Sequence, residues 1–179
     1  MNPLLNQLQP YPFARLREAM QGIDAPAGVK PVPLHIGEPK HATPKVITDA
    51  LTASLPELAS YPLSAGLPEL RQACADWAAR RYDGLTLNPD TEILPVLGSR
   101  EALFAFAQVV LDPTAAEKNI VISPNPFYQI YEGAAYLGGG DIYFANCRAP
   151  DFMPAWHEVP EQIWQRTKLV FVCSPNNPC

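Results

Sequence analysis

The chain has 179 residues, of which 47% are hydrophobic and 17% charged, so it can bury a core of ordinary size. Its 13 basic and 18 acidic side chains give a net charge of −5, which argues against a surface that binds nucleic acid or an anionic membrane. No apolar run reaches the roughly 18 residues that a membrane span needs, and residues 1–10 lack the pattern of a secretory signal. We therefore expect a cytoplasmic protein that contacts neither nucleic acid nor membrane.

The metal-binding residue types show no metal-binding spacing. The four cysteines contain no C-x-x-C pair and are Cys74, Cys147, Cys173 and Cys179. In a reducing compartment we interpret them as small buried hydrophobic residues. The three histidines lack helical ligand spacing and are His35, His41 and His157. No metal site is expected.

The first half of the chain is predicted to be an irregular arm followed by two helices. Residues 1–43 carry one short helical pattern, over residues 13–20, before a run of prolines forbids its continuation. A helix is predicted over residues 44–55, with Thr43 as its N-cap. Its apolar stripe consists of Val46, Ile47, Ala50, Leu51 and Leu55. A second helix is predicted over residues 68–82, and one of its faces carries Leu70, Ala73, Cys74, Trp77 and Arg81.

Strands and helices alternate in the second half of the chain. Strands are predicted over residues 92–97, 119–123, 141–145 and 168–173, and helices over residues 100–111, 127–137 and 158–166. Apolar strands that alternate with helices are typical of an α/β fold, with a mostly parallel sheet covered by helices on both faces. We expect residues 1–43 to form an arm or part of a small domain, and residues 44–179 to form the first, incomplete part of a larger domain.

Three predicted strand ends carry residues suited to binding, because parallel sheets bind ligands at the carboxyl ends of their strands. Gly98 and Ser99 lie at a helix N-terminus, where free N–H groups favour a phosphate. Phe127 and Tyr128 follow a strand, where an aromatic ring can stack on a flat ligand. Residues 174–178 place two amides beyond the last strand. Each feature also has a structural explanation: a serine cap, core packing of the two rings, and an Asn-Pro turn.

Five segments, taken in order, resemble a known family. They are IGEP (36–39), YPLSAGLPELR (61–71), GSREALF (98–104), PNPFYQIYEGA (124–134) and SPNNP (174–178). The chain resembles the class I/II pyridoxal-phosphate aminotransferases of fold type I over almost its whole length. Within that family, these segments and the opening NPLLNQLQPYPFARL are most similar to the bacterial succinyldiaminopimelate aminotransferases.

The resemblance implies a pyridoxal 5′-phosphate site. Ser99 and Arg100 would donate backbone N–H groups to the phosphate, Tyr128 would stack on the pyridine ring, and Asn177 would hydrogen-bond the 3′ oxygen of the cofactor. Cys179 stands where the family usually has a threonine, a small residue in place of a small residue.

The resemblance also implies an oligomer and a substrate pocket. Tyr61 matches the tyrosine that reaches the cofactor phosphate in the partner subunit, so the active unit would be a homodimer. Gly37 would line the pocket for the substrate carboxylate.

The family's catalytic lysine, the carboxylate that holds the ring nitrogen and the arginine that binds substrate all lie further along than Asn177. No catalytic role is therefore assigned to the five lysines, which are Lys30, Lys40, Lys45, Lys118 and Lys168. We expect these 179 residues to be an N-terminal fragment that is inactive by itself. Residues 92–97 would lack their sheet neighbours, so the isolated fragment is predicted to be insoluble or poorly folded.

The implied function of the parent protein is amino transfer between glutamate and a keto acid of the diaminopimelate/lysine route, with N-succinyl-2-amino-6-oxopimelate as the expected keto acid. Two alternatives stay open: an aminotransferase of other amino-acid specificity, and a non-catalytic sensor or regulator built on the same fold. A nucleotide-binding Rossmann protein is rejected, because the turn after the first predicted strand reads GSREAL and not G-x-G-x-x-G.

Overall fold

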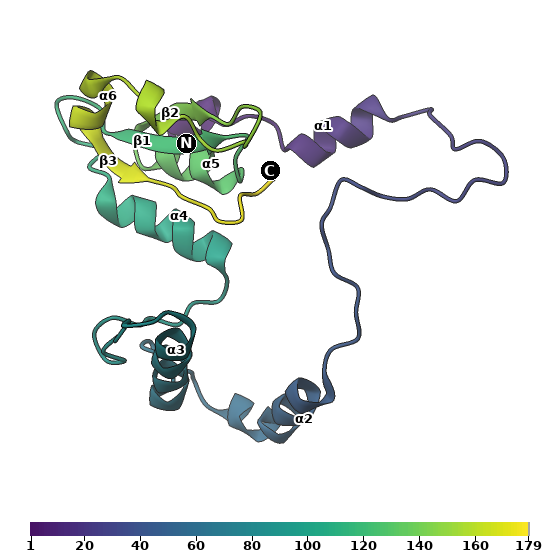
Figure 1. Ribbon diagram of the computed structural model, residues 1–179, viewed down its shortest axis with the longest axis vertical. Helices are drawn as coiled ribbons and strands as arrows, with labels where there is room; N and C mark the ends of the chain where they lie inside the picture. The colour runs from purple at the N-terminus through teal and green to yellow at the C-terminus, as the bar shows by residue number, and fades with distance from the viewer. Residues whose placement is uncertain (179) are drawn as a thin grey trace. The chain divides into compact units, whose positions relative to one another are not determined.

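The computed structural model describes residues 1–178 and divides into two compact units (Figure 1). One unit combines Met1–Ala14 with the chain from Val96 onward, and the other is Arg15–Pro95. Among the described residues, no helix has the length and apolar character that crossing a membrane requires.

The first unit is built on a parallel sheet of three strands in the order β2-β1-β3. The strands are β1 (Ile120–Asn125), β2 (Asp141–Asn146) and β3 (Thr167–Val170). Val121 pairs with Ile142 of β2 and with Leu169 of β3, so β1 is hydrogen-bonded on both edges. The first five residues of β1 are buried, which explains the apolar run Ile120–Ile122 at its start. The predicted parallel sheet is confirmed.

Helices cover both faces of this sheet, as the sequence predicted (Figure 1). One face packs against α4 (Ser99–Val110) and α5 (Ile130–Leu137). Its core consists of Ala107, Leu111, Val121, Tyr131, Ala134, Ala135 and Phe171. The opposite face packs near η3 (Trp156–Glu158) and α6 (Glu161–Arg166), through Ile120, Ile122, Ala145 and Val159. Successive residues of β1 therefore enter different cores, because side chains alternate across a strand.

The strand predicted over residues 92–97 is wrong, because this segment forms neither helix nor strand. A strand exists only where a neighbour pairs with it, and Pro95 also has no N–H to donate. No described strand pairs with this segment, and Leu94, Val96 and Leu97 are exposed. The lack of sheet neighbours was expected. The poor folding of an isolated fragment stays a prediction.

The helices of the N-terminal half are those predicted, with bounds shifted by a few residues. They are α1 (Pro12–Ala19), α2 (Lys45–Ala53) and α3 (Pro68–Arg81). Two 3-10 helices were not predicted, η1 (Pro3–Gln7), which contacts α5, and η2 (Leu55–Ala59). Residues 23–44 form no regular element, in agreement with the expected arm. The assignment of domains at residue 43 stays a prediction.

Three details of these helices differ from expectation. Thr43 is not the N-cap of α2, since Pro44 occupies that position without a side-chain hydrogen bond. The apolar stripe of α2 is exposed, so within the described residues nothing covers it. In α3 the predicted face is wrong, because Trp77 is exposed whereas Ala75 and Ala78 are buried. Periodicity identified these helices but not the surface that each one buries.

The cysteines were expected to be buried, and this is wrong for the three that the structure describes. Cys74 is exposed, and Cys147 and Cys173 are only half-buried. No disulfide joins these three cysteines to one another. Cys179 lies outside the described residues. Within those residues, no cluster of histidine, cysteine or acidic side chains could hold a metal ion.

Candidate functional site

The carboxyl ends of the three parallel strands lie at one edge of the sheet. The connection from β1 to β2 runs through α5 on one face, and the connection from β2 to β3 runs through α6 on the other face. The two connections therefore run on opposite faces of the sheet, and in open α/β sheets ligands bind outside the carboxyl ends of the strands. The segments that follow β1 and β3 flank this place, and Figure 1 shows α4 beginning at the same end of the sheet.

The N-terminus of α4 offers backbone donors at this edge. Gly98 is the N-cap and has a φ of 150°, a conformation that favours glycine, and no side chain caps the helix. Ser99 is the first helical residue and not the cap, so the explanation of this serine as an ordinary N-cap is wrong. The first N–H groups of a helix have no partner within it, and the helix dipole favours a negative charge there.

Tyr128 lies against this helix terminus. The Nε–H of Arg100 donates a hydrogen bond of 2.9 Å to the hydroxyl oxygen of Tyr128, which joins α4 to the loop before α5. This hydrogen bond, followed by the electrostatic interaction with the same tyrosine, is the main cause that raises the pKa of Arg100. Tyr128 is half-buried, whereas its neighbour Phe127 stacks on Phe144 with ring centroids 4.9 Å apart. Core packing therefore explains Phe127 well and Tyr128 only in part.

Two rings support Tyr128 from the core side. Tyr131 meets Tyr128 edge to face, with centroids 5.8 Å apart and an interplanar angle of 85°. Tyr131 in turn stacks on Phe171 at 4.2 Å and 9°, and it is buried. Burial, followed by the nearby Cys173 thiol, raises the pKa of Tyr131 to about 12. Tyr131 is therefore a neutral, tightly packed ring that supports the Tyr128 ring from the core side.

The segment after β3 brings amides to the same edge. Asn176 donates from Nδ2 to the Sγ of Cys147 at 3.8 Å, and its Oδ1 is buried without a partner among the described residues. Asn125, at the end of β1, donates to Asn146 at the end of β2 at 2.8 Å. Side-chain contacts thus join the ends of β1 and β2, and join the segment after β3 to the residue that follows β2. Asn177 is exposed, and its amide makes no hydrogen bond with the described residues.

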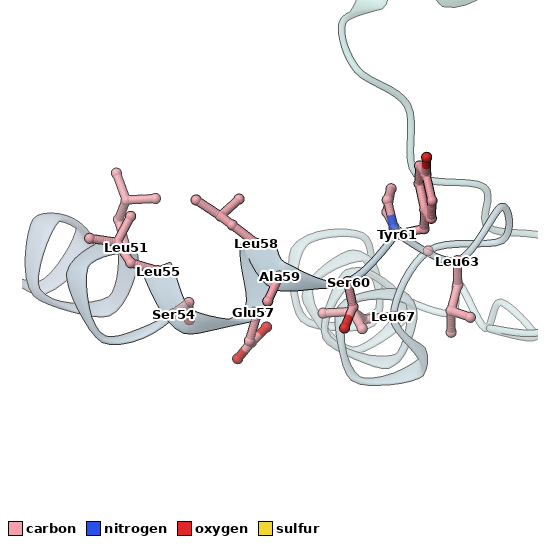
Figure 2. Close-up of a pocket in the computed structure, with 12 residues that line it drawn as sticks. Leu51, Ser54, Leu55, Glu57, Leu58, Ala59, Ser60, Tyr61, Leu63 and Leu67 are labelled. Carbon is pink, nitrogen blue, oxygen red and sulfur yellow. The ribbon is translucent and has the colours of Figure 1, made fainter.

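The structure therefore brings Arg100, next to Ser99, together with Tyr128, and Asn177 lies in the exposed segment that follows β3. The other two predicted residues belong to the second unit. Gly37 lies in the irregular arm, and Tyr61 is fully exposed at the rim of an apolar cavity of about 830 Å³. Figure 2 shows Tyr61 projecting to the same side of its segment as Leu58.

Two contributions to this site were missed by sequence reasoning. The Arg100 side chain was given no role, and Tyr131 was not singled out. Tyr131 follows Tyr128 by three residues, a spacing that places side chains on one face of a helix. The helix predicted over residues 127–137 contained both tyrosines, whereas α5 begins only at Ile130 and Tyr128 lies in the segment before it.

Comparison with known proteins identifies the family. The sequence model for "Aminotransferase class I and II" matches residues 29–179, most of the chain. The chain belongs to this family. A crystal structure of an aminotransferase from Neisseria meningitidis Z2491 is similar, with 73% identity and a TM-score of 0.93. This similarity covers 99% of the chain and 45% of that protein. The predicted resemblance and fold class are confirmed.

More distant aminotransferases show the same coverage. The structure of the aminotransferase AspB from Helicobacter pylori 26695 is 38% identical, has a TM-score of 0.84, and is matched over 96% of the chain and 44% of that protein. The LL-diaminopimelate aminotransferase of Aquifex aeolicus is 35% identical over 97% of the chain and 44% of its own length. The chain thus spans less than half the length of these enzymes.

Proposed function

We propose that the protein containing this chain is a pyridoxal-phosphate-dependent aminotransferase, and that this chain holds the phosphate and one ring face of the cofactor. The observation that carries the proposal is the hydrogen bond between Arg100 and Tyr128. It places a helix N-terminus, which suits a phosphate, beside a half-buried aromatic ring, which suits a flat heterocycle. A phosphorylated pyridine has both features in one molecule.

The side chains and backbone groups at this edge fit the cofactor chemically. The backbone N–H groups of Ser99 and Arg100 would hold the phosphate, and the ring of Tyr128 would lie against the pyridine face. The amide of Asn177 is exposed and uncommitted, so it is available for the 3′ oxygen. When bound, pyridoxal phosphate acts as an electron sink for the amino-acid substrate. The contribution of these residues is to bind and orient it.

None of the five lysines is proposed as the catalytic lysine. Lys118 forms an ion pair of 2.9 Å with Asp141, the first residue of β2, at the edge of the sheet opposite to the site. Lys45 forms an ion pair of 2.6 Å with Asp49 on the exposed surface of α2. We propose that the lysine, the carboxylate and the substrate-binding arginine are supplied by parts of the protein beyond these 179 residues.

The proposed reaction transfers an amino group between glutamate and a keto acid. The first candidate for the keto acid is N-succinyl-2-amino-6-oxopimelate, on the sequence resemblance given above. A second candidate reaction is that of the LL-diaminopimelate aminotransferases, because relatives of this name are 32–36% identical to the chain. Gly37 is proposed to line the substrate pocket.

The proposed active unit is a cytoplasmic homodimer in which Tyr61 reaches the cofactor phosphate of the partner subunit. Two features of the second unit support it. The Tyr61 side chain is fully exposed, and the apolar residues of the neighbouring α2 are also exposed, as expected for a surface that a second subunit covers.

The test uses the full-length protein, loaded with pyridoxal phosphate and assayed with glutamate and N-succinyl-2-amino-6-oxopimelate, and with LL-diaminopimelate for the second candidate reaction. We expect a visible absorbance band from the bound cofactor and turnover in one of the two reactions. Tyr128→Leu and Asn177→Ala should weaken cofactor binding. Gln165→Ala, which changes an exposed residue of α6, is the matched control and should not. A protein that stays colourless would refute the proposal, and cofactor binding without turnover would favour a sensor.

A further inference from the structure

The side chain of Arg100 has no role in the proposed function, which uses only its backbone N–H. Arg100 lies in the first turn of α4, and its side chain is exposed. Its Nε–H nevertheless reaches the hydroxyl oxygen of Tyr128, 28 residues away in sequence, at 2.9 Å. This distance is that of a well-formed N–H···O hydrogen bond. The contact joins the proposed phosphate-binding element to the proposed stacking ring.

The hydrogen bond completes the support of the Tyr128 ring. On the core side, Tyr131 meets the ring edge to face, and Tyr131 is itself fixed by Phe171. The hydroxyl end is held by Arg100. A guanidinium can only donate and is charged at every physiological pH, so the phenol oxygen accepts from it under all working conditions. A ring supported at its edge and at its hydroxyl has fewer orientations than one supported at the edge alone.

We propose that Arg100 is a positioning residue: through its Nε–H it holds the Tyr128 ring at the tilt required for stacking on the cofactor and at a fixed distance from the phosphate-binding terminus of α4. The inference rests on the proposed function. Its consequence is preorganisation, because the ring need not be ordered when the cofactor enters.

A different role for Arg100 would be that of a simple positive charge near the phosphate. A double-mutant cycle separates the two roles. If Arg100 acts through Tyr128, removing the hydroxyl with Tyr128→Phe makes a further change of Arg100 harmless. If Arg100 acts as a charge, the two losses multiply. Arg100→Met retains the backbone N–H at residue 100, so the proposed phosphate contact is preserved in every variant.

The experiment measures cofactor binding and ring orientation in the full-length protein. The variants are Arg100→Met, Tyr128→Phe and their combination, and the readouts are the pyridoxal-phosphate Kd and the circular dichroism that the protein induces in the cofactor band. We expect each single change to raise Kd about threefold to tenfold and to alter the dichroism. The Kd of the double variant should be no higher than the Kd of the single variant that binds the cofactor more weakly.

The matched control is Arg148→Met, which removes an exposed arginine whose partner is Glu158 at 3.0 Å in a surface ion pair. It should change neither readout. Arg100→Lys keeps the charge and should recover less than half of the lost affinity, because an ammonium lacks the directed donor of the guanidinium. It also replaces Arg100→Met if that variant does not fold.

Two results overturn the inference while leaving the proposed function intact. Multiplicative losses in the double variant would show that Arg100 acts independently of Tyr128. Unchanged binding and dichroism in Arg100→Met would show that the hydrogen bond does not position the ring. If the unmodified protein does not bind the cofactor, the proposed function is refuted and the inference falls with it.

Discussion

Replacing Gly98 with alanine tests the geometry at the start of α4. Gly98 has φ 150° and ψ 145°, close to a region that is essentially restricted to glycine. A β-carbon placed there would also lie 2.6 Å from Oε2 of Glu101. The first problem is a property of the backbone and cannot be relieved locally. The second involves the far end of a flexible side chain, which can rotate away.

Gly98→Ala is therefore expected to lower the free energy of unfolding by a larger contribution from the backbone and a smaller one from the Glu101 side chain. Holding a non-glycine residue in a sparsely populated backbone region costs about 1–3 kcal/mol. Moving the carboxylate of Glu101 costs up to about 1.5 kcal/mol if it forces an unfavourable rotamer. In urea denaturation of the full-length protein, Gly98→Ala should lower the unfolding midpoint. Adding Glu101→Ala should restore only the smaller part. Cofactor affinity should also fall, because the first N–H groups of the helix follow Gly98.

Gly84→Ala is the matched control. Gly84 also has a positive φ, of 75°, but a β-carbon there would meet nothing within 4 Å. The Gly84→Ala variant should lower the free energy of unfolding by about 1–2 kcal/mol through backbone strain alone and leave cofactor binding unchanged. If Gly98→Ala unfolds at the wild-type urea concentration and binds cofactor normally, residue 98 does not adopt this conformation and the description of the α4 terminus is wrong.

Three further predictions address the core, the pH response and the dimer. Ile122→Ala, at a fully buried position of the central strand, should lower the free energy of unfolding by about 2–5 kcal/mol, and a smaller loss in denaturation would contradict the packing described. The pKa of Tyr131 is raised from 10.0 to about 12 in the folded state, so its contribution to stability is complete below pH 10 and is lost as the pH rises toward 12. In thermal melts at increasing pH, Tyr131→Phe should reduce the fall of Tm between pH 10 and pH 12. An unchanged dependence of Tm on pH would show that Tyr131 does not cause the alkaline loss of stability. Tyr61→Ala and Asn177→Ala should each lower activity at a limiting cofactor concentration. If Tyr61 serves the partner's site, mixing the two kinds of subunit should restore activity to about a quarter of that of the unmodified protein; no recovery would place both residues in one subunit's site.

Local sequence was sufficient where one segment carries the whole physical cause. The apolar β-branched run over residues 119–123 predicted a strand, and β1 is found at Ile120–Asn125 because those side chains enter cores on both faces. Residues 92–97 have a similar apolar character but form no strand. The difference is the partner: a strand is stabilised by hydrogen bonds to another segment, and these are not encoded in the run itself.

The amino-acid sequence by itself determined three of the four predicted strands, the main helices, the family, and the kinds of groups at the strand ends, because turns, periodicity and motifs are local properties. Only the tertiary structure decided that the side chain of Arg100 meets Tyr128 and that Tyr131 supports the ring from the core. Residues 28 positions apart come together because α4 and α5 bury their apolar faces against the same side of the sheet. Burial sets the positions of the two elements, and the hydrogen bond between Arg100 and Tyr128 follows from them.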